Sequence, residues 1–270
     1  MKKQWFIKLI AVISVTALLL ITAACSGNSQ ANDNSLQKVL DAKQLVLGLD
    51  DNYPPMGYTD ESGEIVGFDI DLAQEVCNRL GIGLVKKPIK WDEKEQDLNN
   101  GTIDCIWNGL SVTPERAESM CLSKPYFRNE LVFVVMSNSN IRNMKDINGK
   151  KVGVQSGSTP QKVLESSEPS MDVTIVNFSN NNELMHSLKQ GEIDVAFVCS
   201  INVYYYISMS EERFFVLPDS VCNEELAIGF RKNDQALCNK VQDTISEMKA
   251  DGTLKKLSEK WFGSDITIVK

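Results

Sequence analysis

The sequence has little histidine, little positive charge and no clustered metal ligands. His186 is the only histidine, and it falls within a helix expected over residues 181–190, where a surface or packing role is favoured. No Ser/His/Asp set, metal-ligand cluster, phosphate-binding loop or CxxC pair appears. The 36 acidic residues outnumber the 28 basic ones and give a net charge of −8, which argues against a nucleic-acid partner and a polybasic membrane patch. We therefore expect neither an enzyme nor a metal or cofactor site.

The one long apolar run lies at the N-terminus, at residues 9–21. Its length of about 13 residues is below the roughly 20 that a membrane-spanning helix needs. Two alanines lead from it to Cys25, which resembles the lipobox of bacterial lipoproteins, although Thr22 stands where that motif usually has leucine. We expect residues 1–24 to be a signal peptide, Cys25 to be lipidated and residues 25–40 to be a flexible tether. An uncleaved membrane anchor is the alternative.

The chain without its leader is more acidic and large enough for two lobes. Loss of three lysines with the leader changes the net charge to −11, and about 235 residues follow the tether. That length suits one large domain or two lobes of roughly 100–120 residues each. Six cysteines remain, at positions 77, 105, 121, 199, 222 and 238, and an exported chain would permit any of 15 disulfide pairings. Cys77 and Cys105 fall in apolar surroundings, so we expect mostly buried, reduced thiols.

Short apolar runs alternate with helix-period segments along the body, which predicts an α/β fold. The expected elements are strands at 45–49, 84–89 and 104–107 and a helix at 68–80. Residues 98–104 (LNNGTID) are echoed by residues 188–194 (LKQGEID), and each copy places a helix-ending glycine and an aspartate before a buried strand. The echo favours two similarly built halves, although chance similarity of so short a unit is the alternative.

Two apolar strands are expected to connect the halves. A strand at residues 131–136 would carry the chain into the second half, and one near residues 222–228 would bring it back. This predicts one lobe from residues 41–132 and 228–270 and another from residues 133–227, joined by a two-stranded hinge.

Six motifs, in order along the chain, resemble the family-3 bacterial extracellular solute-binding proteins, the polar amino-acid receptors of ABC importers. The motifs are DDNYPPM (50–56), GFDIDLA (67–73), IDCIWNGLSVTPER (103–116), SKPY (123–126), VGVQSGST (152–159) and DGTL to KWFG (251–263). The resemblance covers nearly the whole body from about residue 45 to residue 263. It implies a two-lobed α/β fold of the periplasmic-binding-protein-like type II, whose lobes close on a small ligand.

The resemblance implies a carboxylate-binding site at three residues. Arg116 matches the residue that grips the ligand carboxylate, because a guanidinium can make two parallel hydrogen bonds to it; a surface salt bridge is the alternative. Ser158 and Thr159 lie between a strand and a helix, where free N–H groups and the helix dipole attract an anion. Capping of that helix alone is the alternative reading of both residues.

Further positions match residues that complete the family's pocket. Asn108, Gly109 and Ser111 match a loop that meets the ligand's backbone-like end, although Asn and Ser are also ordinary turn residues. Tyr53 and Trp91 match aromatic positions that line the side-chain pocket, and the alternative for both is a place in the core.

One position departs from the family pattern. Five residues after Asp194, relatives usually carry an aspartate that pairs with the ligand's α-ammonium, whereas this chain has Cys199. A neutral thiol is a poor acceptor, and losing a charge-assisted hydrogen bond would cost roughly 1.5–3 kcal/mol. Either Asp50 or backbone carbonyls near Gly109 take the ammonium, or the ligand lacks one. Asp50 also matches an acid that meets a cationic ligand side chain; capping of its loop is the alternative.

These expectations combine into one function. The chain is expected to be a monomeric, lipid-anchored solute-binding lipoprotein on the extracellular face of the bacterial membrane. It would capture a polar amino acid or related small carboxylate and deliver it to the permease of an ABC transporter. The alternatives are a receptor for a carboxylate without an amino group, a signalling ligand sensor and, less favoured, a dehydratase-like enzyme on the same fold.

Overall fold

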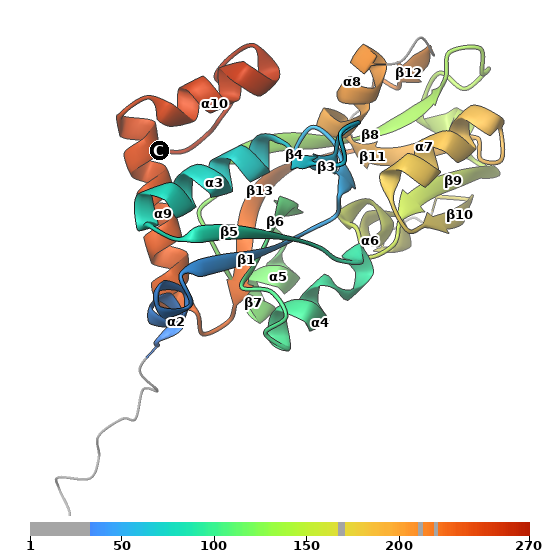
Figure 1. The fold of residues 1–270 in the computed structure, drawn as a ribbon. Helices are drawn as coiled ribbons and strands as arrows, with labels where there is room; N and C mark the ends of the chain where they lie inside the picture. The colour runs from blue at the N-terminus through green and yellow to red at the C-terminus, as the bar shows by residue number, and fades with distance from the viewer. Residues whose placement is uncertain (1–32, 167–170, 210–212, 219–220) are drawn as a thin grey trace, which may run out of the picture. The chain divides into compact units, whose positions relative to one another are not determined.

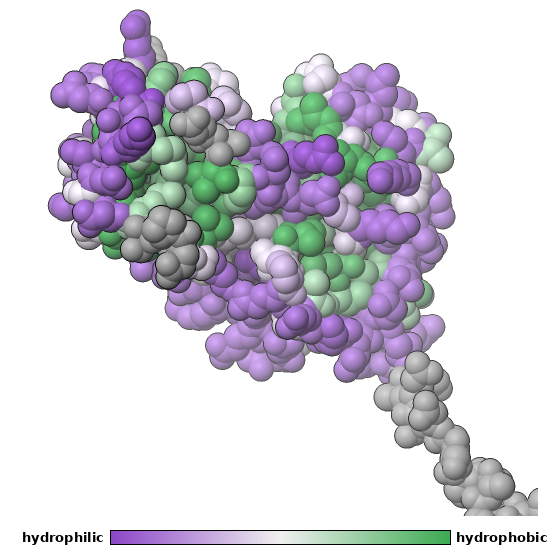
Figure 2. Space-filling model, turned by 180° about the vertical axis from the view of Figure 1, so that it is seen from behind, coloured by the Kyte–Doolittle hydropathy of each residue, from purple (hydrophilic) through white to green (hydrophobic). Residues whose placement is uncertain are grey.

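The computed structural model describes residues 33–166, 171–209, 213–218 and 221–270. The expected signal peptide, the expected lipid-modified Cys25 and the start of the expected tether lie outside these residues. Among the described residues, no helix combines the length and the apolar character that a membrane crossing requires. On the face shown in Figure 2, hydrophilic residues cover most of the surface and apolar residues form smaller patches, as the acidic composition suggests.

Helix α2 (Ser35–Ala42) occupies the end of the segment expected to be a tether. Val39 of this helix is buried in the core. The Ser35 hydroxyl also accepts a hydrogen bond from Leu237 N at 3.1 Å, more than 200 positions along the chain. Residues 35–40 therefore belong to helix α2 and not to a flexible segment, which corrects the C-terminal end of the expected tether at residues 25–40.

The first group of elements, called lobe 1, is built on three parallel strands (Figure 1). Strand β1 lies between β5 and β6 and is parallel to both. The elements of lobe 1 are α2, β1 (Gln44–Leu49), β2 (Asn52–Tyr53), β3 (Gly57–Thr59), β4 (Ile65–Val66), α3 (Phe68–Leu80), β5 (Gly83–Pro88), the 3-10 turn η2 (Trp91–Glu93), α4 (Lys94–Asn99), β6 (Cys105–Ser111), α5 (Pro114–Ser119), β7 (Met120–Leu122), α9 (Gln235–Ala250) and α10 (Thr253–Phe262). The predicted helix over 68–80 is confirmed, and it ends because Gly81 adopts the left-handed conformation with φ 69°.

The second group, lobe 2, repeats the plan with β9 between β10 and β11 and parallel to both. Its elements are the 3-10 turn η3 (Met144–Ile147), β9 (Lys150–Gln155), α6 (Thr159–Ser166), β10 (Val173–Phe178), α7 (Asn181–Gln190), β11 (Val195–Cys199), α8 (Ser200–Met209) and β12 (Phe214–Val216). His186 is exposed on α7, as expected from its position in the sequence.

Two antiparallel strands, β8 (Phe127–Met136) and β13 (Cys222–Arg231), cross between the lobes. The first half of β8 pairs with β13, and its second half pairs with β11 and β12. The far end of β13 pairs with β6 and β7. One sheet of order β10-β9-β11-β8-β13-β6-β1-β5 therefore runs through both lobes.

The internal echo has a structural counterpart in each lobe. Gly101 and Gly191 both adopt left-handed conformations, with φ 74° and 75°. In lobe 1 the Asp104 carboxylate accepts a hydrogen bond from Val46 N of β1 at 2.9 Å. In lobe 2 the Asp194 carboxylate accepts one from Lys151 N of β9, also at 2.9 Å. Each aspartate thus fastens its own strand to the neighbouring parallel strand.

The core lies between the sheet and the helices that cover it. In lobe 1, Phe68 of α3 packs against Phe127 and Phe262 with ring centroids 6.1 and 5.2 Å away. In lobe 2, Phe133 stacks on Phe197 at 4.3 Å. No disulfide joins the six body cysteines in the described structure, and all except Cys222 are buried.

Candidate functional site

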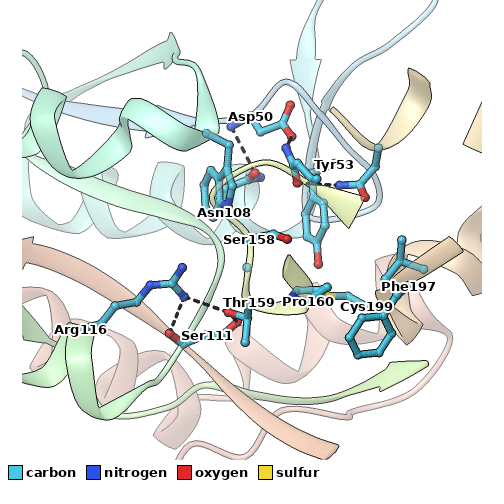
Figure 3. A pocket seen from close by; sticks show the side chains of 15 residues that line it. Asp50, Tyr53, Asn108, Ser111, Arg116, Ser158, Thr159, Pro160, Phe197 and Cys199 are labelled. Atoms are coloured by element: carbon cyan, nitrogen blue, oxygen red, sulfur yellow. Dashed lines mark hydrogen bonds between the residues drawn. The ribbon is translucent and has the colours of Figure 1, made fainter. Parts of the chain in front are cut away.

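One pocket is lined by residues from both lobes (Figure 3). All ten residues that the sequence predicts as ligand contacts lie in its wall: Asp50, Tyr53, Trp91, Asn108, Gly109, Ser111, Arg116, Ser158, Thr159 and Cys199. Sequence reasoning missed five further lining residues: Gln155, Pro160, Asn181, Phe197 and Val198. The pocket lies at the carboxyl ends of β6, β9 and β11, the usual place for ligands in open α/β sheets.

Arg116 is held in the pocket by the short helix α5. Thr113 caps this helix, because its hydroxyl accepts a hydrogen bond from Arg116 N, and Pro114 fits the first turn. The side chain is only 2% exposed. Its Nη1 donates to Ser111 O at 2.9 Å and to Thr159 Oγ1 at 3.3 Å, while Nε has no partner among the described residues. A buried guanidinium with neutral partners is suited to bind an anion.

Ser158 and Thr159 stand at the N-terminus of α6 and serve different purposes. The Ser158 hydroxyl accepts a hydrogen bond from Gln161 N at 3.3 Å, so this residue caps the helix. Thr159 Oγ1 instead donates to Ser111 Oγ at 2.8 Å, across the junction between the lobes. The preceding Gly157 has φ 70°, and a side chain there would approach Asp92 Cα of lobe 1 to 2.7 Å. Glycine at this position therefore permits the close approach of the two lobes.

Asn108, Gly109 and Ser111 belong to strand β6 rather than to the expected loop. The strand extends to Ser111 because its end pairs with β13, at Leu226 and Ala227. Asn108 Oδ1 accepts a hydrogen bond from the backbone of Asp50 at 3.3 Å, so its amide is used to hold lobe 1 together.

Gly109 needs its lack of a side chain. It has φ 61°, and a Cβ there would lie 2.7 Å from the Tyr53 ring. Its N–H donates to the buried Asp69 carboxylate at 2.9 Å. Burial raises the pKa of Asp69 to about 7. Asp69 is a positioning residue that the sequence analysis did not single out.

Tyr53 and Trp91 lie both in the core and in the pocket wall, the two alternatives that the sequence left open. Each is 7% exposed, packs in a hydrophobic core cluster and also lines the pocket. The Tyr53 hydroxyl is buried next to the Cys199 thiol and makes no hydrogen bond of regular geometry to the described residues. Burial raises its pKa well above the ordinary value of 10.0, and the neighbouring Cys199 and Glu224 add to the effect.

Asp50 forms a contact between the lobes. Its Oδ2 accepts a hydrogen bond from Gln155 Nε2 of lobe 2 at 2.6 Å, and its Oδ1 accepts one from Asn52 N at 2.9 Å. Burial raises the pKa of this carboxyl above the ordinary value of 3.8, and the Gln155 hydrogen bond opposes the rise. Gln155 is in turn held by Asn181 Nδ2 at 2.9 Å.

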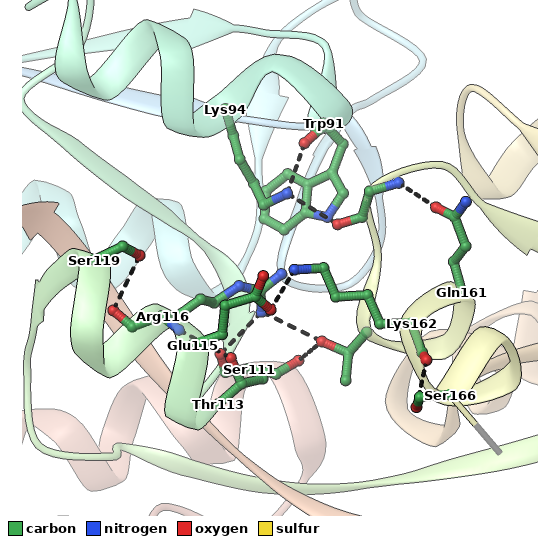
Figure 4. Close-up of polar contacts among 12 residues, drawn as sticks. Trp91, Lys94, Ser111, Thr113, Glu115, Arg116, Ser119, Gln161, Lys162 and Ser166 are labelled. Carbon is green, nitrogen blue, oxygen red and sulfur yellow. Dashed lines mark hydrogen bonds and ion pairs between the residues drawn. The ribbon is translucent and has the colours of Figure 1, made fainter. Parts of the chain in front are cut away.

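A second set of contacts joins the lobes beside Arg116 (Figure 4). Lys94 Nζ, 3% exposed, donates to Trp91 O in lobe 1 and to Gly157 O in lobe 2, both at 2.9 Å. Burial lowers the pKa of Lys94 to about 7, and the charge of Arg116 contributes. Lys162 of lobe 2 forms an ion pair with Glu115 of lobe 1 at 2.6 Å. These contacts hold the lobes closed.

The thiol of Cys199 lies beside a buried carboxylate, that of Glu224. Its Sγ donates to Glu224 Oε1 at 3.0 Å. The same carboxylate accepts hydrogen bonds from Ser111 Oγ and from Asn129 Nδ2, both at 2.5 Å. Glu224 is 7% exposed although it lies in strand β13, distant in sequence from every pocket motif. Asn223 and Glu225 flank it in the strand, so no local sequence signal sets Glu224 apart.

Known proteins resemble this chain along its whole body. Residues 45–264 match the model of the bacterial extracellular solute-binding proteins, family 3. The L-cystine-binding protein TcyJ of Escherichia coli (strain K12) is 30% identical over 259 residues, which cover 95% of this chain and 96% of that protein.

Solved structures show the same fold. A substrate-binding protein of an ABC uptake transporter from Streptococcus pneumoniae, with bound histidine, superposes with a TM-score of 0.85 at 34% identity and covers 88% of this chain and 99% of its own. Tv2483 bound to L-arginine gives a TM-score of 0.84 at 31% identity, over 88% and 98% of the two chains. Because the family match spans both lobes and the pocket between them, this chain belongs to the bacterial extracellular solute-binding proteins of family 3.

Proposed function

We propose that this protein is the extracellular substrate-binding component of an ABC importer and that it captures a polar amino acid between its lobes. The observation that carries the proposal is the buried guanidinium of Arg116 in the pocket wall. Its hydrogen-bond partners among the described residues are the neutral oxygens of Ser111 and Thr159. A ligand carboxylate would supply the missing negative charge and a partner for Nε.

Binding would proceed through closure of the lobes. The open form takes the ligand carboxylate at Arg116, and lobe 2 then brings Ser158, Thr159 and the N-terminus of α6 onto it. Closure excludes water, which strengthens each charged contact in the pocket. The bonds from Gln155 to Asp50 and from Lys94 to Gly157 would form in the same step.

The ten pocket residues are proposed to be the ligand contacts. The relatives named above bind L-cystine, histidine and L-arginine, which share the α-amino acid group and differ in side chain. We assign that shared group to the Arg116 end of the pocket, and the ligand side chain to Tyr53, Trp91 and Asp50. The hinge then lies near residues 131–136 and 222–228, with lobes of residues 41–132 plus 228–270 and 133–227.

The mature protein is proposed to be a monomeric lipoprotein anchored through Cys25 after removal of residues 1–24. The supporting feature is the pair of alanines between the apolar run and Cys25. In cells that express the full chain, Cys25→Ser should abolish incorporation of labelled fatty acid. Incorporation that persists in this variant would contradict the anchor.

Cys199 supports one second candidate, a receptor for a carboxylate without an amino group. A screen of melting temperature distinguishes the two, because a bound ligand raises the melting temperature by mass action. The probes are L-cystine, L-arginine, L-histidine and L-glutamine, each with its deaminated acid and its decarboxylated amine. If the protein serves an importer of amino acids, it should bind at least one amino acid and bind the corresponding amine far more weakly. It should also release the ligand chemically unchanged. A shift with the deaminated acids alone would favour the second candidate, and a modified ligand would indicate an enzyme.

A further inference from the structure

We propose that Glu224, from the crossing strand β13, accepts the α-ammonium of the bound amino acid in place of the aspartate that Cys199 replaces. The inference rests on the proposed function and deepens it, because it assigns both charges of a zwitterionic ligand to named residues. It makes Glu224 a specificity-determining residue, which selects amino acids over carboxylic acids of the same shape.

Glu224 is buried and forms no direct ion pair within the described residues, although the charge of Arg116 is near. The side chain is 7% exposed, and its partners are the neutral donors of Ser111, Asn129 and Cys199. Among the described residues, no lysine or arginine forms an ion pair with it. A buried carboxylate without a direct ion pair is costly, and a ligand ammonium would offset that cost.

The charges of Arg116 and Glu224 lie close together. Ser111 contacts both: its carbonyl accepts from Arg116 Nη1 at 2.9 Å, and its hydroxyl donates to Glu224 Oε2 at 2.5 Å. The cationic and anionic groups are therefore separated by a single residue of β6. The carboxylate and ammonium of an α-amino acid are attached to one carbon atom, so they need two opposite charges at such close range.

The thiol of Cys199 is neutral and supports the carboxylate of Glu224. Burial raises the pKa of Cys199 well above its ordinary value of 9.0, and the neighbouring Glu224 carboxylate raises it further. Cys199 is thus a neutral S–H group that donates to Glu224. A carboxylate offers about four acceptor sites, of which three are occupied here, so one remains for an ammonium.

Glu224 lies immediately behind the pocket wall. Ser111 and Cys199 line the pocket, and Glu224 contacts both side chains. Asp50 is the other carboxylate near the ligand, and it is bonded to Gln155 of lobe 2 and to the backbone of Asn52. Glu224 instead contacts Ser111, the residue that also accepts from Arg116. We assign Asp50 to the ligand side chain and Glu224 to the ammonium.

The test compares an amino acid with its deaminated acid in wild type and in Glu224→Gln, a variant that removes the charge and keeps the shape. Isothermal titration uses L-arginine with 5-guanidinopentanoate, L-histidine with 3-(imidazol-4-yl)propanoate, L-glutamine with 4-carbamoylbutanoate, and L-cystine with 3,3′-dithiodipropanoate. Glu224→Gln should weaken the amino acid about ten- to hundredfold, as expected for loss of a charge-assisted hydrogen bond, and leave the deaminated acid within about threefold.

The chain offers a matched control in Glu225→Gln. Glu225 is the next residue of β13, but its side chain is 45% exposed and pairs with Arg128 at the surface. This variant should bind both compounds as wild type does. Asp50→Asn should lower affinity for L-arginine without changing the ratio of an amino acid to its deaminated acid.

Several outcomes would overturn the assignment. An equal loss for both compounds in Glu224→Gln would show a structural role, and an unchanged ratio would show that another group takes the ammonium. A ratio that changes in Asp50→Asn would identify Asp50 as that group. If wild type bound none of the four amino acids, the proposed function itself would fail, and the assignment would fail with it.

If Glu224→Gln does not fold because the buried cluster loses its carboxylate, a second variant that keeps one carboxylate there replaces it. The double variant Glu224→Gln with Cys199→Asp returns a carboxylate to the neighbouring position. It should restore the preference for the amino acid over the deaminated acid. A folded double variant without that preference would also overturn the assignment.

Discussion

The helix–glycine–aspartate–strand unit occurs once in each lobe, and both copies end at the same pocket. In lobe 1 the strand after Asp104 reaches Asn108, Gly109 and Ser111, and in lobe 2 the strand after Asp194 reaches Cys199. The start of each unit makes the same contact, an aspartate that accepts from the neighbouring strand at 2.9 Å. The ends differ in chemistry. The shared start stabilises the sheet, whereas the strand ends form the pocket wall and can differ in chemistry.

The two lobes also differ in the charged groups that they bring to the pocket. Lobe 1 contributes Arg116 five residues beyond its strand end, while lobe 2 contributes a neutral thiol. The pocket wall holds the carboxylate of Asp50, and a second carboxylate, Glu224, lies beside the thiol on a strand that belongs to neither unit. The comparison therefore predicts that substitutions at the start of each unit affect folding and that substitutions at the ends affect binding.

The largest expected effect is at the cationic end of the pocket. Arg116→Ala should raise the dissociation constant for the best-binding amino acid about a hundredfold or more, because the carboxylate loses its bidentate partner. Arg116→Lys should recover only part of the affinity, since an ammonium lacks the planar fork. Isothermal titration measures both, with Arg128→Ala, an exposed arginine of β8, as the control. An unchanged constant in Arg116→Ala would remove Arg116 from the site.

The next largest effect is expected at Asp104 and Asp194, the aspartates at the start of the two units. Asp104→Ala should lower the free energy of unfolding by about 2 kcal/mol, since Asp104 holds both Val46 N and Arg231. Asp194→Ala should cost about 1 kcal/mol, because this exposed residue holds only Lys151 N in the described structure. Urea unfolding followed by circular dichroism measures both values.

The exposed Asp243→Ala on α9 is the control for these two variants and should change stability by less than about 0.5 kcal/mol. If Asp194→Ala were as costly as Asp104→Ala, the two units would be equivalent in energy as well as in geometry. If neither variant lost stability, the echo would have no structural purpose.

A smaller effect is expected at the end of the second unit. The family pattern alone predicts that Cys199→Asp tightens the binding of amino acids. With Glu224 Oε1 3.0 Å from the thiol, we expect instead that the two carboxylates repel and lower the free energy of unfolding by about 1 kcal/mol. Binding should not tighten unless Glu224 is also neutralised. Tighter binding in the single variant would support the family pattern and contradict our expectation.

The smallest effect concerns the contact between the lobes at Lys94. Its pKa is lowered to about 7 in the folded protein from an ordinary 10.5, so the unfolded chain binds more protons between these values. The contribution of Lys94 to stability should therefore rise as the pH increases from 7 to 9. Relative to Lys94→Met, the melting temperature of wild type should gain about 2–4 °C over this range. A constant difference would show that Lys94 keeps its ordinary pKa.

The sequence predicted the pocket residues well because most of them stand at the ends of strands or beside helix starts. Gly109 and Ser158 lie within motifs whose glycines, capping residues and apolar runs can be recognised locally. The start of the body was predicted less well: residues 35–40 looked like tether because their polar composition hides the few contacts, such as Val39, that bind α2 to the core.

The residues that were missed share a different property. Gln155 and Lys94 matter because they bond to the opposite lobe, and Glu224 matters because β13 pairs with β6 and β8. The residues next to them in the sequence do not indicate which distant residues they will contact. Pairing between segments more than 90 positions apart depends on the register of the whole sheet, which short motifs do not encode.

The sequence by itself determined the family, the alternation of strands and helices, ten of the fifteen residues of the pocket wall and the cationic end at Arg116. Each of these depends on local patterns: periodicity, glycine positions and short motifs. Only the tertiary structure placed a second carboxylate, Glu224, beside the pocket. Cys199 looked like the loss of a charge, yet the folding of β13 beside it brings the buried carboxylate of Glu224 to within 3.0 Å of the thiol. Charge balance in a buried site is a property of neighbours in space, and only the assembled sheet sets those neighbours.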